Sequence, residues 1–332
     1  MQNKVILITG SNGEIGKALI KKFIKNSLNQ IITIDLKKSE NDCLVHEAFH
    51  GSILDKKLID SINNKYQINE VYHLAAILST KGESDPVLAT DINVNGTKNI
   101  LNLSVKQCEK DNNRILFFFP SSIAVYNTQK SINQKIDEKS FCENPLTTYG
   151  KTKLISESYG INIEKNSNVD FRCIRFPGII SATSKPTGGT SDYAPEMIHH
   201  AAQKKEYQCF VNSLTKLPFI VMPDAIRSIR MLMESPKNNL KNYIYNISSF
   251  NPSVEDLYLE TKKYFDNFVL SYFINNQRQK IVNSWPKSID DSKAKKDWGW
   301  APQYNLENAF QNYLIPHISS YYKGIKNEYV KK

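Results

Sequence analysis

KVILITGSNGEIG, residues Lys4 to Gly16, decides the fold of this chain. VILIT, from Val5 to Thr9, is the kind of apolar run expected of a strand that is buried on both faces of a parallel sheet. Gly10, Gly13 and Gly16 follow at the start of a helical pattern. Glycines let the backbone turn sharply and approach a pyrophosphate at the helix N-terminus. The stretch predicts a dinucleotide-binding turn, and the alternative is an ordinary glycine-rich strand–helix turn.

The pattern that opens the chain repeats through its first half. Helical spacing covers 14–25 and 91–108, and a further helix begins near Tyr149. Strand-like segments lie at 31–35, 71–76, 114–122 and 171–180. This alternation predicts an α/β fold, a Rossmann-type doubly wound parallel sheet.

The pattern loosens after Ile180. Residues 181–194 are rich in Gly, Ser, Thr and Pro and predict a loop, followed by a helix over 195–205. A late strand and a helix with Ser253 ahead of Asp256 come later. We therefore expect an NAD-binding domain over 1–180, to which some later segments return, and a smaller substrate lobe mainly over 181–332.

Composition and charge narrow the class of protein. The chain has 332 residues, of which 40% are hydrophobic and 23% charged, as in ordinary globular proteins. No apolar run is long enough to span a bilayer, and strand-like sequence begins at Lys4. We expect a soluble cytoplasmic protein, or a mitochondrial one if a transit segment has been removed.

The basic charge does not indicate a nucleic-acid partner. The net charge is +10, but the lysines are scattered and form no basic stripe interleaved with aromatic residues. The five cysteines are odd in number and lack a CxxC or His partner pattern. Free thiols and no metal site are therefore expected.

An acidic residue closes the second predicted strand. Asp35 ends IITID, where a carboxylate can accept hydrogen bonds from an adenosine ribose and repel a 2′-phosphate. This favours NAD over NADP, although Lys37 and Lys38 weaken the discrimination. The alternative is a plain turn residue at a strand end.

Three further residues suggest hydride chemistry at a carbon that bears a hydroxyl. Tyr149 and Lys153 lie four apart at what reads as the exposed start of a helix, so they share a face. An ammonium beside a phenol lowers the tyrosine pKa, which suits Tyr149 to proton transfer. Ser121 and Ser122 end a strand, and one hydroxyl there can orient a substrate oxygen toward Tyr149. The alternative is that both serines cap the following turn.

These residues resemble those of the extended short-chain dehydrogenase/reductase superfamily, and more closely the short-chain-type L-threonine 3-dehydrogenases. The strings that carry the resemblance are HLAAILS (73–79), PSSIAVY (120–126), RFPGIIS (175–181), GGTSDYA (188–194) and SWPKSIDDSKAKKDWGW (284–300). The resemblance implies a Rossmann domain, NAD as cofactor, and oxidation of L-threonine to L-2-amino-3-ketobutyrate. It also implies a homodimer formed by helices of the dinucleotide domain.

The resemblance assigns roles by position. The catalytic set is Ser122, Tyr149 and Lys153. Cofactor contacts are implied for Gly10, Asn12, Gly13, Glu14, Ile15, Gly16, Asp35, Leu36, Ser52, Ile53, Leu74, Ala75, Ala76, Asn93, Tyr149, Lys153 and Ile179. Substrate contacts are implied for Ser79, Ser122, Tyr149, Gly178, Thr190, Ser191 and Trp285.

Several of these residues have plainer interpretations. Ser79, Thr190 and Ser191 could be loop hydroxyls that satisfy backbone groups, and Trp285 could be core packing. Ser191 also replaces the second threonine of the family string. His73 reads as a satisfied structural histidine, and His199 and His200 read as helix surface.

Three functions remain open. The first is NAD-dependent threonine oxidation with Tyr149 as base, whose product either decarboxylates to aminoacetone or is cleaved by a 2-amino-3-ketobutyrate CoA ligase. The second is a nucleotide-sugar epimerase or dehydratase, for which Arg278 and Lys280 could clamp a diphosphate. The third is a dinucleotide-binding protein without enzymatic activity.

Overall fold

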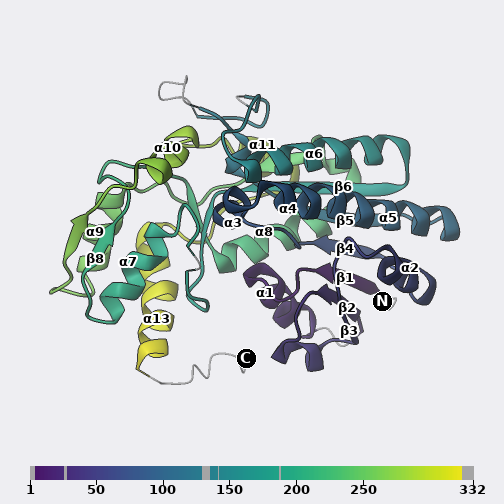
Figure 1. Cartoon of the computed structure of the whole chain (residues 1–332), viewed down its shortest axis with the longest axis horizontal. Helices are drawn as coiled ribbons and strands as arrows, with labels where there is room; N and C mark the ends of the chain where they lie inside the picture. Colours follow the sequence, from purple (N-terminus) through teal and green to yellow (C-terminus); the bar gives the residue numbers. More distant parts are fainter. Residues whose placement is uncertain (1–3, 26–27, 129–134, 141, 187, 324–332) are drawn as a thin grey trace.

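A seven-stranded parallel sheet forms the centre of the structure, a computed structural model that describes residues 4–25, 28–128, 135–140, 142–186 and 188–323 (Figure 1). In spatial order its strands are β10 (Ile244–Asn246), β6 (Val169–Phe176), β5 (Ile115–Ser122), β4 (Glu70–His73), β1 (Val5–Thr9), β2 (Gln30–Asp35) and β3 (Glu47–His50). The chain winds outward from β1 to β3, then returns to β4 and winds the other way. The predicted doubly wound α/β fold is confirmed, with its reversal point between β1 and β4, where open parallel sheets bind ligands.

Side chains alternate between the two faces of this sheet. Ile6 and Ile8 of β1 pack into one hydrophobic cluster and Leu7 into another. The first cluster lies under α1 (Glu14–Phe23) and α8 (Met222–Glu234). The second lies under α2 (Lys56–Lys65), α5 (Thr97–Asp111) and α6 (Thr148–Asn166).

The remaining elements extend the sheet domain to one side. Two short parallel sheets pair β7 (Gly178–Ile180) with β9 (Phe219–Val221) and β8 (Tyr207–Cys209) with β11 (Leu270–Tyr272). The other helical elements are η1 (Glu40–Leu44), α3 (Ser79–Ser84), α4 (Pro86–Thr90), η2 (Asp91–Gly96), η3 (Ile123–Val125), α7 (Tyr193–Ala202), η4 (Lys237–Asn239), α9 (Val254–Lys262), α10 (Asn276–Ser284), α11 (Ser292–Trp298), α12 (Leu306–Ala309), η5 (Phe310–Leu314) and α13 (Ile315–Tyr322). Figure 1 shows α7, α9, α13 and β8 together beyond one end of the main sheet.

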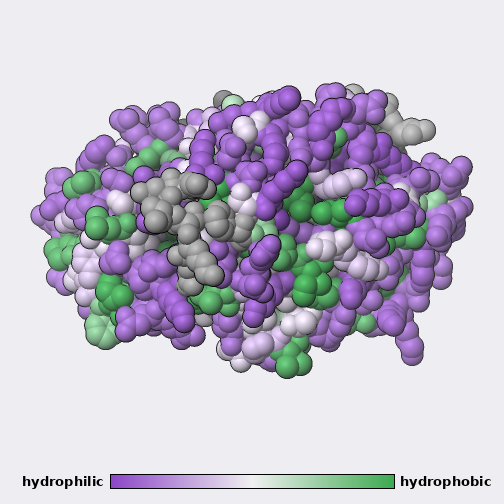
Figure 2. Space-filling model, turned by 90° about the horizontal axis from the view of Figure 1, so that it is seen from above, coloured by the Kyte–Doolittle hydropathy of each residue, from purple (hydrophilic) through white to green (hydrophobic). Residues whose placement is uncertain are grey.

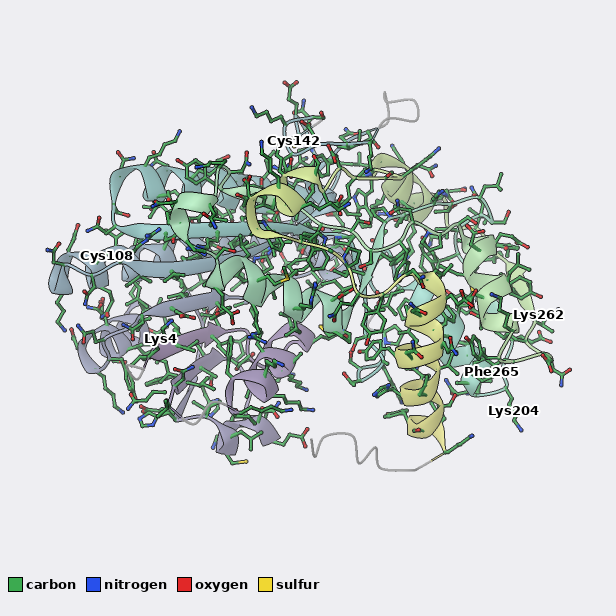
Figure 3. The ribbon with its side chains drawn as sticks, turned by 180° about the vertical axis from the view of Figure 1, so that it is seen from behind. Lys4, Cys108, Cys142, Lys204, Lys262 and Phe265 are labelled. Atoms are coloured by element: carbon green, nitrogen blue, oxygen red, sulfur yellow. The ribbon has the colours of Figure 1, made fainter. Side chains whose placement is uncertain are left out.

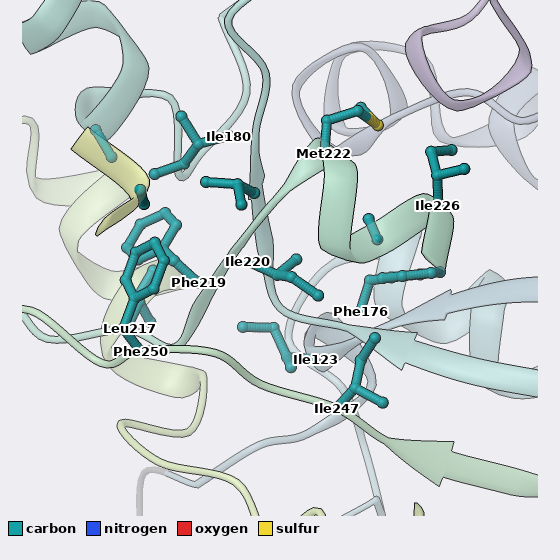
Figure 4. Packing of buried hydrophobic residues seen from close by; sticks show 14 of the residues in the cluster. Ile123, Phe176, Ile180, Leu217, Phe219, Ile220, Met222, Ile226, Ile247 and Phe250 are labelled. Carbon is teal, nitrogen blue, oxygen red and sulfur yellow. The ribbon is translucent and has the colours of Figure 1, made fainter. Parts of the chain in front are cut away.

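A continuous apolar core joins the two parts. Ile123 of η3 lies beside Ile247, which follows β10, and Ile220 of β9 belongs to the same buried cluster (Figure 4). Because Ile123 follows Ser122 directly, this packing fixes the carboxyl end of β5.

Several predicted boundaries differ from the structure. The single strand expected over 171–180 breaks into β6 and β7, which belong to different sheets. Pro177 lies at the break, and proline has no N–H to donate to a sheet. The strand expected over 71–76 ends at His73, and the helix expected over 91–108 begins with the π-helical turn η2. The helix expected over 195–205 covers 193–202 and is followed by Lys204 in a left-handed conformation, with φ of 59°.

The cysteines are free, as predicted. Cys108 and Cys142 lie in separate parts of the molecule (Figure 3). Across the described ranges, no three His, Cys, Asp or Glu side chains form a group able to hold a metal ion. None of the helices in these ranges is long and apolar enough to cross a membrane.

Candidate active site

The glycine turn after β1 has a shape that larger residues could not adopt. Gly10 has φ of 68°, and a Cβ there would lie 2.6 Å from the backbone nitrogen of Ala75. A Cβ on Gly16 would lie 2.6 Å from the carbonyl oxygen of Ser11. Gly13 precedes α1, and no side chain caps this helix N-terminus. The turn thus leaves the helix end open to an anion and fits the pyrophosphate of a dinucleotide.

Asp35 lies directly beside this turn. Its carboxylate accepts hydrogen bonds from the backbone nitrogens of Asn12, at 2.9 Å, and Lys37, at 3.3 Å. Gly10 in turn donates to the carbonyl of Ile34, at 2.8 Å. The acidic group therefore occupies the position that suits it to a ribose diol.

The other proposed cofactor residues follow the same edge of the sheet. Ser52 and Ile53 come after β3, Leu74 to Ala76 come after β4, and Leu36 follows Asp35 with 69% of its surface exposed. Asn12, Glu14 and Ile15 belong to the glycine turn and the first turn of α1. Ile179 lies farther along the chain in β7. Apart from Asn93, Ile179 and the α6 residues Tyr149 and Lys153, the set thus lies at or just beyond the carboxyl ends of β1 to β4.

Asn93 has a structural task. Its side chain is buried, accepts from the backbone nitrogen of Ile77 at 2.7 Å, and donates to the Ile77 carbonyl at 3.0 Å and to Thr152 Oγ1 at 3.1 Å. It therefore fastens the segment after β4 to α6, the helix that carries Tyr149 and Lys153.

The structure brings Ser122, Tyr149 and Lys153 together. Ser122 ends β5, and its hydroxyl forms a hydrogen bond with Tyr149 while also accepting from the backbone nitrogen of Ala124 at 3.1 Å. The Lys153 ammonium lies 5.6 Å from the centre of the Tyr149 ring and donates to the Pro120 carbonyl at 2.7 Å. Ser122 thus both caps the next turn and faces the phenol.

The expectation of an exposed pair with a lowered tyrosine pKa is wrong for this structure. Lys153 is buried, with 4% of its surface exposed, and Tyr149 is half-buried. Burial raises the pKa of Tyr149 to about 12, and the hydrogen bond with Ser122 offsets only part of this effect. Burial also lowers the pKa of Lys153 to about 8. Each group is poorly hydrated, which disfavours its charged form.

Ser121 is the serine that does not reach Tyr149. It is buried, and its hydroxyl has no hydrogen-bond partner among the described residues. An unsatisfied buried hydroxyl at the carboxyl end of a central strand is consistent with a ligand group that completes the site.

Two predicted substrate residues meet across the molecule. Ser79 begins α3, and its hydroxyl lies 3.5 Å from that of Thr190 in the 181–194 loop. Both side chains are buried, whereas Ser191 is half-buried. Glu83 of α3 accepts from the backbone nitrogen of Thr148 at 2.6 Å, which ties this helix to the start of α6 beside Tyr149.

The same loop is held by Thr80, which the sequence did not mark, and by Arg278, which it marked only for a diphosphate. Thr80 Oγ1 and Arg278 Nη2 donate to the Gly188 carbonyl at 2.6 and 2.9 Å. The Arg278 guanidinium also lies 4.2 Å from the centre of the Phe210 ring. Thr80 has no local signal, because its partner is 108 residues away; only its position next to Ser79 could have drawn attention to it.

The other substrate candidates line the junction between the two parts. Gly178 begins β7, where a Cβ would lie 2.5 Å from the Phe219 ring. Trp285 is buried with 6% of its surface exposed, and its indole nitrogen has no partner within the described ranges. A buried N–H of this kind is consistent with either a ligand contact or packing alone.

The histidines are not part of this set. His73 is buried between the hydroxyls of Thr9, at 2.8 Å, and Thr97, at 2.9 Å, as the sequence predicted. The expectation that His199 lies on a helix surface is wrong, since only 5% of it is exposed. It packs against Tyr322, whose hydroxyl lies 3.0 Å from His199 Nδ1.

Comparison with known proteins identifies the family to which this chain belongs. The model of the NAD dependent epimerase/dehydratase family matches residues 6–248. A mitochondrial L-threonine 3-dehydrogenase of Bos taurus is 33% identical over 320 residues, which cover 95% of this chain and 83% of that protein.

Solved structures agree. A monomeric L-threonine 3-dehydrogenase of metagenomic origin, in its apo form, has a TM-score of 0.84 and 38% identity, with 97% of this chain and 100% of that chain covered. L-threonine dehydrogenase from Clostridium difficile has a TM-score of 0.87 and 33% identity, with 98% of this chain and 100% of that chain covered. Together with the glycine turn, Asp35 and the Ser122–Tyr149–Lys153 set, these matches place the chain in the NAD dependent epimerase/dehydratase family.

Proposed function

We propose that this protein oxidises the side-chain hydroxyl of L-threonine with NAD and produces L-2-amino-3-ketobutyrate. The observation that carries the proposal is the pairing of two sets: Ser122 with Tyr149 and Lys153, and Ser79 with Thr190. Glu83 connects the two, because it lies on the helix begun by Ser79 and accepts from Thr148. One set suits alcohol oxidation, and the other supplies hydroxyls for a small polar substrate.

Tyr149 acts as the base. Ser122 and Tyr149 bind the hydroxyl of threonine, and Tyr149 takes its proton as the Cβ–H bond breaks. NAD bound at the glycine turn would supply the nicotinamide that accepts the hydride from Cβ. Because the pKa of Tyr149 lies at about 12 in the protein alone, the phenol needs positive charge beside it to serve near neutral pH. Lys153 supplies such a charge in its ammonium form.

The amino-acid end of threonine binds in the junction. Thr190 and Ser79 donate to or accept from its carboxylate or ammonium, with Ser191 as the neighbouring hydroxyl and Gly178 and Trp285 at the wall. Gly178 lets the Phe219 ring pack directly against the backbone at this wall, because a Cβ there would lie 2.5 Å from that ring. The several hydroxyls of this region favour a compact polar substrate.

Asp35 selects the cofactor. Its carboxylate is anchored by Asn12 and Lys37, so it is held beside the turn rather than free to swing away. A fixed negative charge there favours the ribose diol of NAD over the 2′-phosphate of NADP. Gly10, Gly13 and Gly16 would hold the pyrophosphate, and Ser52 and Ile53 would border the adenosine.

A substrate screen tests the proposal directly. Purified protein with NAD is given L-threonine, L-serine, L-allo-threonine or UDP-glucose, and NADH absorbance is followed. We expect turnover with L-threonine, and on the order of 100-fold or greater loss of kcat in Tyr149→Phe with NAD affinity retained. Turnover of another alcohol but not of threonine would reject the substrate assignment.

The rival is a nucleotide-sugar epimerase or dehydratase, which the name of the family also allows. It requires basic groups for a diphosphate, yet Arg278 already donates to Gly188 and stacks on Phe210, and Lys280 is exposed. Epimerisation of UDP-glucose without threonine oxidation would favour this rival.

Two further relationships belong to the proposal. The protein acts as a homodimer through helices of its sheet domain. Its product is a β-keto acid, which either loses carbon dioxide to give aminoacetone or passes to a 2-amino-3-ketobutyrate CoA ligase. Aminoacetone in the assay without ligase, and glycine with ligase and coenzyme A, are the products expected.

A further inference from the structure

Arg175 connects two chain segments that carry the proposed catalytic set, and it also bonds a third segment, which contains Glu138. It lies on β6 with 3% of its surface exposed. Its Nε and Nη2 atoms donate to the two carboxylate oxygens of Glu157, at 2.8 and 2.6 Å. Its Nη1 atom donates to the Tyr126 hydroxyl at 3.0 Å and to the Glu138 carbonyl at 2.7 Å. A planar guanidinium is suited to such a fixed set of bonds.

The first segment is the helix that carries the base. Tyr149, Lys153 and Glu157 are spaced four apart on α6, so they form one stripe along the helix. The two-point pairing of Glu157 with Arg175 therefore fixes the depth and rotation of the helix face that presents Tyr149 and Lys153.

The second segment is the strand end that carries Ser122. The short turn η3 joins Ser122 to Tyr126, and the Arg175 guanidinium lies 4.9 Å from the centre of the Tyr126 ring. Tyr126 also donates to Asn246 of β10 at 2.8 Å. The Arg175 guanidinium thus holds both sides of the contact between Ser122 and Tyr149, although its own hydrogen bonds within the described residues go to neither of them.

We propose that Arg175, through Glu157 and Tyr126, is a positioning residue that sets Ser122 and the Tyr149–Lys153 pair in register for hydride chemistry. This inference rests on the proposed function of that set. It assigns a task to a buried ion pair that would otherwise only join β6 to α6.

The ion pair also shapes the charge around Lys153. The titratable groups that face Lys153 are Tyr149 and Glu157 on its own helix, Cys173 on β6 and His73 on β4. Glu157 raises the pKa of Lys153 against the effect of burial. Loss of the Glu157 charge therefore lowers the pKa of Lys153. Because Arg175 offsets the charge of Glu157, loss of Arg175 raises the pKa of Lys153.

A second buried ion pair on the same strand provides a matched control. Arg172 is buried and pairs with Asp170 at 2.6 Å, and it donates to the Leu232 carbonyl at the end of α8. It lies three residues before Arg175, but within the described part of the chain its hydrogen bonds go to Asp170 and to the end of α8, not to α6 or to Tyr126. Its loss disturbs β6 without disturbing the proposed register.

The test compares Arg175→Met, Arg175→Lys, Glu157→Gln and Arg172→Met. We expect kcat with L-threonine to fall on the order of 100-fold in Arg175→Met, with NAD affinity changed less than about threefold. We expect a loss on the order of tenfold in Arg175→Lys, because an ammonium lacks the planar fork that pairs with both oxygens of Glu157. Arg172→Met should lower the melting temperature but keep kcat within about threefold. Equal kcat losses in Arg172→Met and Arg175→Met, or full activity in either Arg175 variant, would overturn the proposal.

A second readout needs neither substrate nor cofactor. The pKa of Lys153 is measured by NMR in protein with 13C-labelled lysine, and its resonance is assigned by its loss in Lys153→Met. We expect a lower Lys153 pKa in Glu157→Gln and an unchanged one in Arg172→Met; an unchanged pKa in Glu157→Gln rejects the link. Absence of threonine turnover in the unmodified protein would instead reject the proposed function, so the two failures are distinguishable.

Discussion

The hydroxyl oxygens of Ser79 and Thr190 lie 3.5 Å apart although 111 residues separate them in the chain. One belongs to the helix that follows β4, and the other belongs to the loop that leads into α7. Both are buried. The loop is fixed there by Thr80 and Arg278, which share the Gly188 carbonyl as acceptor. The pair therefore marks where the sheet domain and the later part of the chain meet, which is where we propose that a small polar substrate binds.

Thr190→Val should weaken substrate binding while leaving cofactor binding intact. Valine keeps the shape of threonine but removes the hydroxyl, so a charged substrate group loses a hydrogen bond worth about 1.5–3 kcal/mol. We expect KM for L-threonine to rise roughly 10- to 100-fold, measured by initial rates at saturating NAD. Thr183→Val is the control, because Thr183 lies exposed in the same loop. An unchanged KM in Thr190→Val would move the role to Ser191, which Ser191→Ala then tests.

Asp35→Asn should relax the choice of cofactor. Asparagine keeps an oxygen that can accept from the backbone of Asn12, so the turn is retained, but it removes the charge that repels a 2′-phosphate. We expect NAD to bind more weakly and NADP to bind more tightly, with the ratio of their affinities changing on the order of tenfold. Titration calorimetry measures both. Asp60→Asn, on the exposed side of α2, should change neither affinity.

The elements around the glycine turn could be predicted because local pattern determines them. VILIT, the three glycines and Asp35 each follow from backbone geometry or burial within a few residues. The break at Pro177 had a local signal too, a proline within an apolar run, but the run of apolar residues on both sides favoured one strand. Which sheet each half joins depends on β9, far along the chain.

The burial of Lys153 could not be predicted in the same way. Helical patterns reveal a buried face when its residues are apolar. On α6 the buried face is polar and includes Lys153, Ser156 and Glu157. Their partners are Pro120, Asn93 and Arg175, which lie in other elements. A polar stripe satisfied by distant groups looks like a solvent-exposed face in the sequence.

Acid should destabilise the protein through His73. Burial lowers the pKa of His73 to about 3, from an ordinary value of 6.5, so below pH 6.5 the unfolded chain binds a proton that the folded protein does not. The stability of the fold with a neutral, buried His73 is therefore fully present above pH 6.5, and part of it is lost as the pH falls toward 3. Between pH 7 and 5 the loss is about 2 kcal/mol.

The variant His73→Gln isolates this effect, because glutamine does not titrate. The free energy of unfolding, measured with urea at pH 7 and pH 5, should fall by about 2 kcal/mol more in the unmodified protein than in the variant. His199, whose pKa burial lowers to about 4, contributes equally to both proteins and cancels. Parallel pH dependences in the two proteins would mean that His73 is protonated when folded.

The sheet domain exposes apolar side chains where we expect a second copy to bind. Val87 and Leu88 of α4 are 82% and 41% exposed, Leu78 before α3 is 56% exposed, and Ile155 of α6 is 47% exposed. Figure 2, which looks onto the α6 side, shows apolar groups within a mainly hydrophilic face. We predict a dimer by light scattering of the unmodified protein, and monomers for Val87→Arg combined with Ile155→Arg, because a charge buried in an apolar interface is costly. Leu214→Arg, at an equally exposed site in the other part of the chain, should leave the dimer intact. A monomeric unmodified protein, or a dimer that persists with both arginines, would place any association elsewhere.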